Sequence, residues 1–200
     1  MSDYDYLNAR IRGMSGQLFT SDFYEQVLAS EGKDILIDSL LTSPYGAALK
    51  DALSSDRGVG AAESALRTGL FETFAQVRRL APDKPRRLLS VQFHRWDVEN
   101  IRTIVRGKSV GAAEEDIVAA LFPAGELDPI RLSELAGEPD VLAVVDALAV
   151  MAFPEAFELR RVIKGPVHDV DLVSVDIALS GGFFSWAVDQ TPGSNPNEQM

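Results

Sequence analysis

"RWDVENIRTIVRGK", residues 95–108, is the most informative segment for the fold, because it belongs to a helical stretch with apolar side chains on two sides. At about 100° per residue, one narrow stripe collects Leu89, Phe93, Trp96, Asn100 and Ile104. A second stripe collects Val91, Val98, Ile101 and Val105. The remaining strip, which we expect to face water, carries Arg95, Glu99, Arg102 and Arg106. A helix covered from two sides predicts a fold in which other helices pack around it.

Two polar residues of this stretch, Asp97 and Asn100, lie along the apolar stripes instead of the charged strip. A buried carboxylate or amide without a hydrogen-bond partner costs roughly 1–3 kcal/mol, so both predict partners on another helix. Near the N-terminus a similar set of residues shares one helix face opposite an apolar one. We interpret both sets as structural polar junctions formed by Asp5, Asn8, Arg12, Trp96, Asp97 and Asn100.

Helix signals dominate the whole chain, and strand signals are scarce. Asp22 and Glu25 resemble a capping pair, and Gly107 follows "NIRTIVR" as a C-terminal stop. Pro129 and Pro139 stand where a first helical turn accepts proline. We predict an all-α fold with helices at residues 3–15, 21–29, 34–41, 45–53, 61–81, 86–106, 114–122, 139–153, 154–164 and 169–189.

Three segments recur in the same order along the chain, at offsets of 92, 95 and 113 residues. The pairs are "DYLNAR" with "DVENIR", "LLTSPYGAAL" with "LAGEPDVLAV", and "ALRTGLF" with "ALSGGFF". Offsets that grow in this way indicate loop insertions between two copies of one helical unit. We therefore expect a first unit at residues 1–81 and a second at 86–190, separated by "APDKP". Residues 191–200 are polar and rich in Pro and Gly, and we expect a disordered or linker-like tail.

The charge is uneven. The net charge of −11 argues against general nucleic-acid binding, which depends on cationic groups. Residues 78–108 nevertheless hold nine Lys or Arg against three acids. This asymmetry indicates either a solvated basic surface or a contact with an acidic partner. The candidate partner contacts are Arg78, Arg79, Arg86, Arg87, Arg95, Arg102 and Arg106.

Candidate catalytic or ligand-binding groups are few. His94 and His168 are far apart in sequence, and neither belongs to a spaced set of metal ligands. "RGVGAAE" at residue 57 lacks the lysine of a phosphate-binding loop and the third glycine of the dinucleotide fingerprint. Three acids at residues 114–116 favour a helix N-terminus. We expect no catalytic residue, no metal and no cofactor.

The cellular compartment follows from what the sequence lacks. It has no cysteine, which excludes disulfides and thiolate chemistry and fits a reducing compartment. The N-terminal residues lack the pattern of a signal peptide, and no stretch reaches about 18 uninterrupted apolar residues. We expect a cytoplasmic protein.

"YDYLNARIRGM", "RWDVENIRTIVRGK" and the doubled unit together resemble the C subunit of V-type and A-type rotary ATPases, which is called the d subunit in the eukaryotic enzyme. The resemblance implies an all-helical fold with three similar units around a funnel, of which this chain supplies two. It also implies a non-catalytic rotor component that joins the central stalk to the membrane proteolipid ring. Such a protein lies on the cytoplasmic face of the membrane through its complex.

Two other functions stay open from the sequence. One is a free-standing helical-repeat adaptor that binds another protein through the basic residues. The other is a small helical enzyme that uses His94, His168 and nearby carboxylates. It requires both histidines to share one cleft.

Overall fold

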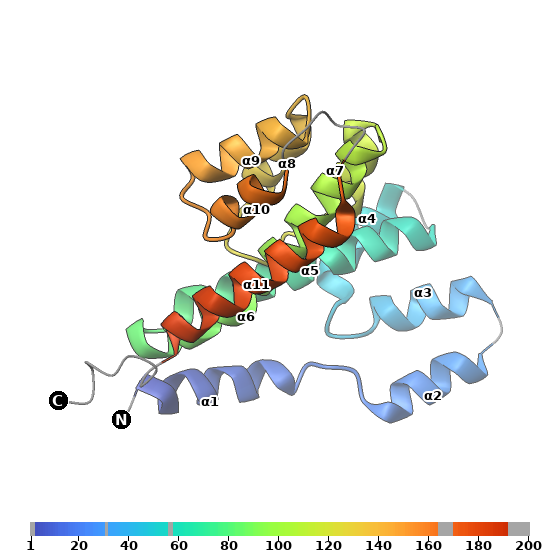
Figure 1. Cartoon of the computed structure of the whole chain (residues 1–200). Helices are drawn as coiled ribbons and strands as arrows, with labels where there is room; N and C mark the ends of the chain where they lie inside the picture. The colour runs from blue at the N-terminus through green and yellow to red at the C-terminus, as the bar shows by residue number, and fades with distance from the viewer. Residues whose placement is uncertain (1–2, 31, 56–57, 164–169, 192–200) are drawn as a thin grey trace. The chain divides into compact units, whose positions relative to one another are not determined.

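A computed structural model describes residues 3–30, 32–55, 58–163 and 170–191, and every regular element in these ranges is an α-helix (Figure 1). The all-α prediction is therefore confirmed. Of the predicted tail at residues 191–200, all residues after Thr191 lie outside the described residues.

The chain divides into two compact units, Met1–Pro85 and Arg86–Met200. "DYLNAR" lies on the first helix of unit 1 and "DVENIR" on the first long helix of unit 2. "ALRTGLF" and "ALSGGFF" likewise lie on the last helix of their respective units. The proposal that the two units are copies of one helical unit stays a prediction.

Unit 1 has a small apolar core. Its helices are α1 (Asp3–Ser15), α2 (Ser21–Ala29), α3 (Lys33–Leu41), α4 (Gly46–Ser55) and α5 (Val59–Leu80). The core lies where α3, α4 and α5 meet and contains Ile37, Leu40, Leu49, Leu53, Ala62 and Ala65. Phe19 extends this core, because its ring stacks on Phe23 at 4.0 Å and contacts Tyr45 at 4.7 Å.

Unit 2 has the larger core, and α6 runs through it. Its helices are α6 (Asp83–Ser109), α7 (Glu114–Ala120), α8 (Pro129–Gly137), α9 (Val141–Val150), α10 (Ala156–Val162) and α11 (Leu172–Gln190). Ile104 from one predicted stripe and Ile101 and Val105 from the other are all fully buried. Helix α6 is therefore covered from two sides, as the periodicity of residues 95–108 indicates. Figure 1 shows α11 lying along α6.

The structure contains one helix that was not predicted, and several helix boundaries differ from the predicted ones. Helix α8 was not among the predicted helices, although Pro129 fits its first turn and the Asp128 carboxylate caps its N-terminus. Helix α9 stops at Val150 instead of residue 153, because Ala152 takes a positive φ of 54° that no helix accommodates. Helix α6 begins at Asp83, which places Pro85 in its first turn.

Of the described helices, α11 is the one long and apolar enough to cross a membrane by length and composition. This is weak evidence, since the core helix of a soluble domain has the same features. Within unit 2, α11 buries Val175, Ala178 and Leu179, and its Asp176 carboxylate is paired with arginines of α6. One side of α11 therefore packs within unit 2, while only 22% of its apolar window is buried in all.

Candidate functional site: a buried polar seam on α6

Four buried polar residues form a continuous seam inside unit 2. His94, Asp97 and Asn100 follow one another at intervals of three residues on α6, so they share one helix face. Glu155 joins them from the connection between α9 and α10. Each of the four residues is at most 5% exposed. We call these four residues the buried polar seam.

Asp97 holds the connection between α7 and α8. Its carboxylate accepts hydrogen bonds from the backbone N–H of Glu126 at 2.7 Å and of Leu127 at 3.0 Å. The neighbouring Gly125 lies so close that a Cβ there would overlap the Asp97 carboxylate. The glycine therefore allows the loop backbone to approach the acid.

Asn100 holds the same connection at a second point. Its side-chain amide donates to the Phe122 carbonyl at 2.8 Å, and its Oδ1 accepts from the Phe122 N–H at 2.7 Å. The ring of Trp96 packs on the Phe122 ring with centroids 4.7 Å apart. Three polar-junction residues of α6 thus converge on one loop, residues 121–128.

The expected partners of Asp97 and Asn100 were on another helix, and this expectation was wrong. Their partners are backbone groups of the irregular segment 121–128. The physical reason is that helix backbones already pair their own N–H and C=O groups, whereas an irregular loop has unpaired ones. A buried loop next to a helix needs such side chains.

His94 and Glu155 form the inner end of the seam. Nε2 of His94 lies 2.9 Å and 3.0 Å from the two carboxylate oxygens of Glu155. Nδ1 lies 3.8 Å from Oδ2 of Asp97, which is ion-pair distance without a direct hydrogen bond. Burial alone lowers the pKa of His94, but the carboxylates of Asp97 and Glu155 outweigh it and raise the pKa from 6.5 to about 9. The imidazole is therefore a cation at neutral pH.

Aromatic rings and a glycine close this end of the seam. The His94 ring contacts Trp186 at 4.2 Å and Phe153 at 4.9 Å between centroids. On α11, a Cβ at Gly182 would lie 2.8 Å from Cγ of Glu155. Gly182 therefore lets α11 pack directly on the buried acid. His94 and Glu155 are therefore enclosed by α11 and the aromatic rings, with exposures of 5% and 0%.

The charged strip of α6 differs from its prediction. Arg102 was expected to face water, yet its side chain is only 16% exposed. Its Nε donates to Asp176 of α11 at 2.9 Å, and Arg106 donates to the same carboxylate at 2.6 Å. The prediction for Arg102 was wrong because α11 covers a third side of α6. Arg102 and Arg106 therefore form their ion pairs within unit 2.

The remaining basic candidates are distributed over both units. Arg79 is exposed and Arg78 half-buried on α5 of unit 1. Arg86, Arg87 and Arg95 are exposed on α6 of unit 2, where Arg87 also donates to the Asp189 carbonyl at 3.0 Å. Their role as partner contacts stays a prediction.

In unit 1 the corresponding polar residues have a different environment. Asp5, Asn8 and Arg12 are exposed on α1, while Leu7 on another side of the helix is buried. Trp96, Asp97 and Asn100 therefore come together at one site in unit 2. The structure does not bring the α1 residues into a buried junction, and a structural role for them stays a prediction.

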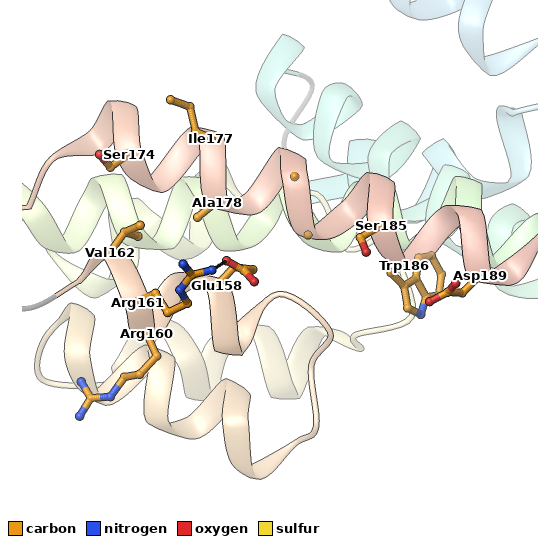
Figure 2. A pocket seen from close by; sticks show the side chains of 12 residues that line it. Glu158, Arg160, Arg161, Val162, Ser174, Ile177, Ala178, Ser185, Trp186 and Asp189 are labelled. Carbon is orange, nitrogen blue, oxygen red and sulfur yellow. Dashed lines mark hydrogen bonds and ion pairs between the residues drawn. The ribbon is translucent and has the colours of Figure 1, made fainter.

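An open groove of about 780 Å³ lies between α10 and α11 of unit 2 (Figure 2). Ile177, Ala178 and Trp186 of α11 give it an apolar side, and Arg161 on α10 pairs with Glu158 at 2.9 Å. Among the described residues no three potential metal ligands gather at this groove or elsewhere. His168 lies outside the described residues, and so does any cleft that it would share with His94.

Comparison with known proteins gives the family. Residues 7–194 match the family model described as ATP synthase (C/AC39) subunit. The chain belongs to this family. The resemblance to the C subunit of V-type and A-type ATPases, drawn from "YLNAR" and "WDVENIRTIVRGK", is therefore confirmed.

Similar proteins are named as C subunits of A-type or V-type ATP synthases. The C subunit of the A-type ATP synthase of Methanocaldococcus jannaschii is 30% identical over 148 residues, which cover 74% of this chain and 37% of the relative. The C subunit of the V-type ATP synthase of Deinococcus radiodurans is 25% identical over 185 residues, covering 92% and 53%. The C subunit of the A-type ATP synthase of Methanothermobacter thermautotrophicus is 28% identical over 191 residues, covering 96% and 47%. The chain thus spans about half the length, or less, of these relatives.

Sequence reasoning missed Glu155 and Gly125. Glu155 directly follows Pro154 at the start of a predicted helix, where an acid is ordinary, and it lies 61 residues from His94. The only signal was on α6, where His94 continues the three-residue spacing of Asp97 and Asn100. That spacing indicates a third inward polar side chain but gives no partner for it.

Proposed function

We propose that this chain is a non-catalytic rotor component of a V-type or A-type ATPase. It couples the central stalk to the membrane proteolipid ring, for ion transport linked to ATP hydrolysis or synthesis. In this role it lies on the cytoplasmic face of the membrane through its complex and binds no nucleic acid. The observation that carries the proposal is the family match over residues 7–194.

The construction of unit 2 supports a mechanical role. A coupling part must transmit force without local deformation, which favours helices joined by fully satisfied buried hydrogen bonds. The buried polar seam fixes α6 to the 121–128 loop and to the start of α10. Among the described residues, no buried side-chain nitrogen or oxygen lacks a hydrogen-bond partner. The buried polar side chains of unit 2 are therefore paired within the protein's own structure.

The exposed arginines supply a candidate contact surface. Arg86, Arg87 and Arg95 lie on the N-terminal half of α6 in unit 2. Exposed guanidinium groups pair well with acidic side chains, and long-range attraction accelerates assembly at low ionic strength. We therefore propose an acidic surface on the stalk or the ring as the partner of these residues.

Affinity purification tests the rotor assignment. The tagged chain, expressed in cells that contain a V-type or A-type ATPase, should copurify with proteins of the central stalk and the proteolipid ring. A free-standing adaptor would instead be recovered with other proteins and no part of the ATPase, which would overturn the proposal. The isolated chain should hydrolyse no ATP under conditions in which the complex does.

Charge reversal tests the contact surface separately. Arg86→Glu, Arg87→Glu and Arg95→Glu combined should abolish copurification at low salt. The matched control reverses three other arginines of unit 2 that are exposed, Arg131, Arg160 and Arg161. If the α6 triple variant assembles as well as this control, the proposed surface is wrong while the rotor assignment stands.

A further inference from the structure

We propose that His94 and Glu155 form an ion-pair latch that holds α10 and α11 on α6 while His94 is protonated, and releases them as pH rises. The latch goes beyond the proposed coupling role, because it is a property of unit 2 that can be measured without any partner. It rests on a buried histidine that faces two buried carboxyl groups at the meeting point of three segments.

The position of Glu155 gives the latch its effect. Glu155 is the residue immediately before α10 and is fully buried, so its carboxylate anchors the first turn of that helix. The Nε2–H group of His94 donates a bifurcated hydrogen bond to both Glu155 carboxylate oxygens, at 2.9 Å and 3.0 Å, and this contact links the Glu155 side chain to α6. Gly182 of α11 packs on the same side chain. A shift of Glu155 would therefore displace the start of α10 and disturb the contact with α11 at Gly182.

The packing around His94 depends on its charge, because two carboxyl groups face its ring. Asp97 faces Nδ1 from α6 itself, and Glu155 faces Nε2 from the α9–α10 connection. The other neighbours are uncharged rings, Phe153 beside Glu155, and Phe183 and Trp186 on α11. Two buried carboxylates around a neutral imidazole would lose the one cation that compensates them, and an unpaired buried charge is strongly destabilising.

Asp97 keeps its place when the latch opens. Two backbone N–H groups hold its carboxylate independently of His94. Glu155 has no comparable pair of backbone donors among the hydrogen bonds of the described residues. We therefore expect loss of the His94 charge to weaken the α10–α11 side of α6 and to spare the 121–128 loop.

The direction of the pH effect follows from linkage. The pKa of His94 is raised in the folded unit from 6.5 to about 9, so the latch is fully effective below pH 6.5. Its contribution falls as pH rises from 6.5 to about 9 and is lost above that. Deprotonation of His94, with its proton passing to solvent, is the opening event.

Imidazole NMR and amide hydrogen exchange test the latch in the full chain. With His168→Gln removing the other histidine signal, His94 should titrate with an apparent pKa of about 9. Between pH 6.5 and 9, the equilibrium for opening of α10 and α11 amides should increase by on the order of 100-fold, after correction for intrinsic exchange. Amides of α8 should change far less. His94 titrating at about 6.5 or below, or α8 opening in parallel with α10 and α11, would overturn the proposal.

Two variants separate the latch from general folding. Glu155→Gln should bring the pKa of His94 down, whereas the control Asp146→Asn, at an exposed carboxylate 3.7 Å from Arg160, should leave it unchanged. The double variant His94→Gln, Glu155→Gln keeps a neutral hydrogen bond between the same positions. Its α10 and α11 amides should show a pH-independent opening equilibrium, and a persistent pH dependence there would contradict the latch.

Discussion

Each unit carries an aspartate and an asparagine three residues apart on a helix, in "DYLNAR" of unit 1 and "DVENIR" of unit 2. The pair in unit 1 is exposed, and the pair in unit 2 is buried. Asp5 and Asn8 are exposed on α1, whereas Asp97 and Asn100 are 1% and 2% exposed on α6. The difference lies in what surrounds the helix. In unit 2 the irregular segment 121–128 brings backbone N–H and C=O groups against α6. In unit 2 the aspartate and the asparagine thus hold a loop, because that loop brings unpaired backbone groups to the helix.

The two units can be followed separately in one sample. All four tyrosines lie in unit 1 and both tryptophans lie in unit 2. Trp96 and Trp186 contact the seam residues or their neighbours, so tryptophan fluorescence reports the unfolding of unit 2. Tyrosine near-ultraviolet circular dichroism reports unit 1.

Removal of the Asp97 carboxylate from the buried polar seam should give the largest loss of stability. Asp97→Ala leaves the N–H groups of Glu126 and Leu127 without acceptors and takes one anion from His94, so we expect unit 2 to lose about 3–5 kcal/mol. Asp5→Ala, its counterpart on α1, should cost less than about 0.5 kcal/mol in unit 1. Urea unfolding followed by the two signals measures both. An unchanged midpoint for Asp97→Ala would contradict a structural role for the seam.

A methyl group on the loop should give the second largest effect. Gly125→Ala places a Cβ in the space of the Asp97 carboxylate, and we expect a loss of about 1–3 kcal/mol in unit 2. Gly13→Ala on α1 has nothing within 4 Å of the new Cβ and should stabilise unit 1 by roughly 0.5–1 kcal/mol. Opposite signs in the two units would support the comparison, and stabilisation by Gly125→Ala would contradict the close approach of the loop.

Substitution of Asn100 and of Asn8 should give a smaller difference in stability between the two units. Asn100→Ala removes both hydrogen bonds to Phe122, whose backbone is only partly buried, so we expect unit 2 to lose about 1–2 kcal/mol. Asn8→Ala on the exposed face of α1 should change unit 1 by less than about 0.5 kcal/mol. Thermal unfolding by the tryptophan and tyrosine signals tests the pair. Equal shifts in the two units would mean that the 121–128 loop does not depend on Asn100.

The sequence alone was sufficient to predict the all-α class and the buried sides of α6. A helix has a fixed periodicity, so the positions of Ile101, Ile104 and Val105 indicate burial on two sides without any knowledge of the neighbours. The same projection directs Asp97 and Asn100 inward, because Asp97 lies at the edge of an apolar stripe and Asn100 in the middle of one. These conclusions depend on local geometry alone.

The partners of those residues depend on contacts that local geometry does not contain. Glu155 is 61 residues from His94, and Asp176 is 74 residues from Arg102. An acid at a helix start and an arginine on a charged strip are both common at surfaces, so neither indicates burial. The pairing arises when α10 and α11 fold back on α6, and only the tertiary structure determines it.

Removal of an ion pair at the surface of each unit should give the smallest difference in stability between the two units. In unit 2 the Asp176 carboxylate bridges Arg102 and Arg106 and is 36% exposed, whereas in unit 1 Glu63 lies 3.5 Å from Arg67 and is 70% exposed. A single exposed pair contributes little because water and salt screen it, and a carboxylate shared by two guanidinium groups contributes more. We expect Asp176→Asn to cost unit 2 about 0.5–1 kcal/mol and Glu63→Gln to cost unit 1 less than about 0.3 kcal/mol. The Asp176 effect should shrink when NaCl is raised to about 1 M. If salt leaves it unchanged, the loss comes from packing between α6 and α11, and the arginines of α6 contribute to unit 2 through their aliphatic stems instead of their charge.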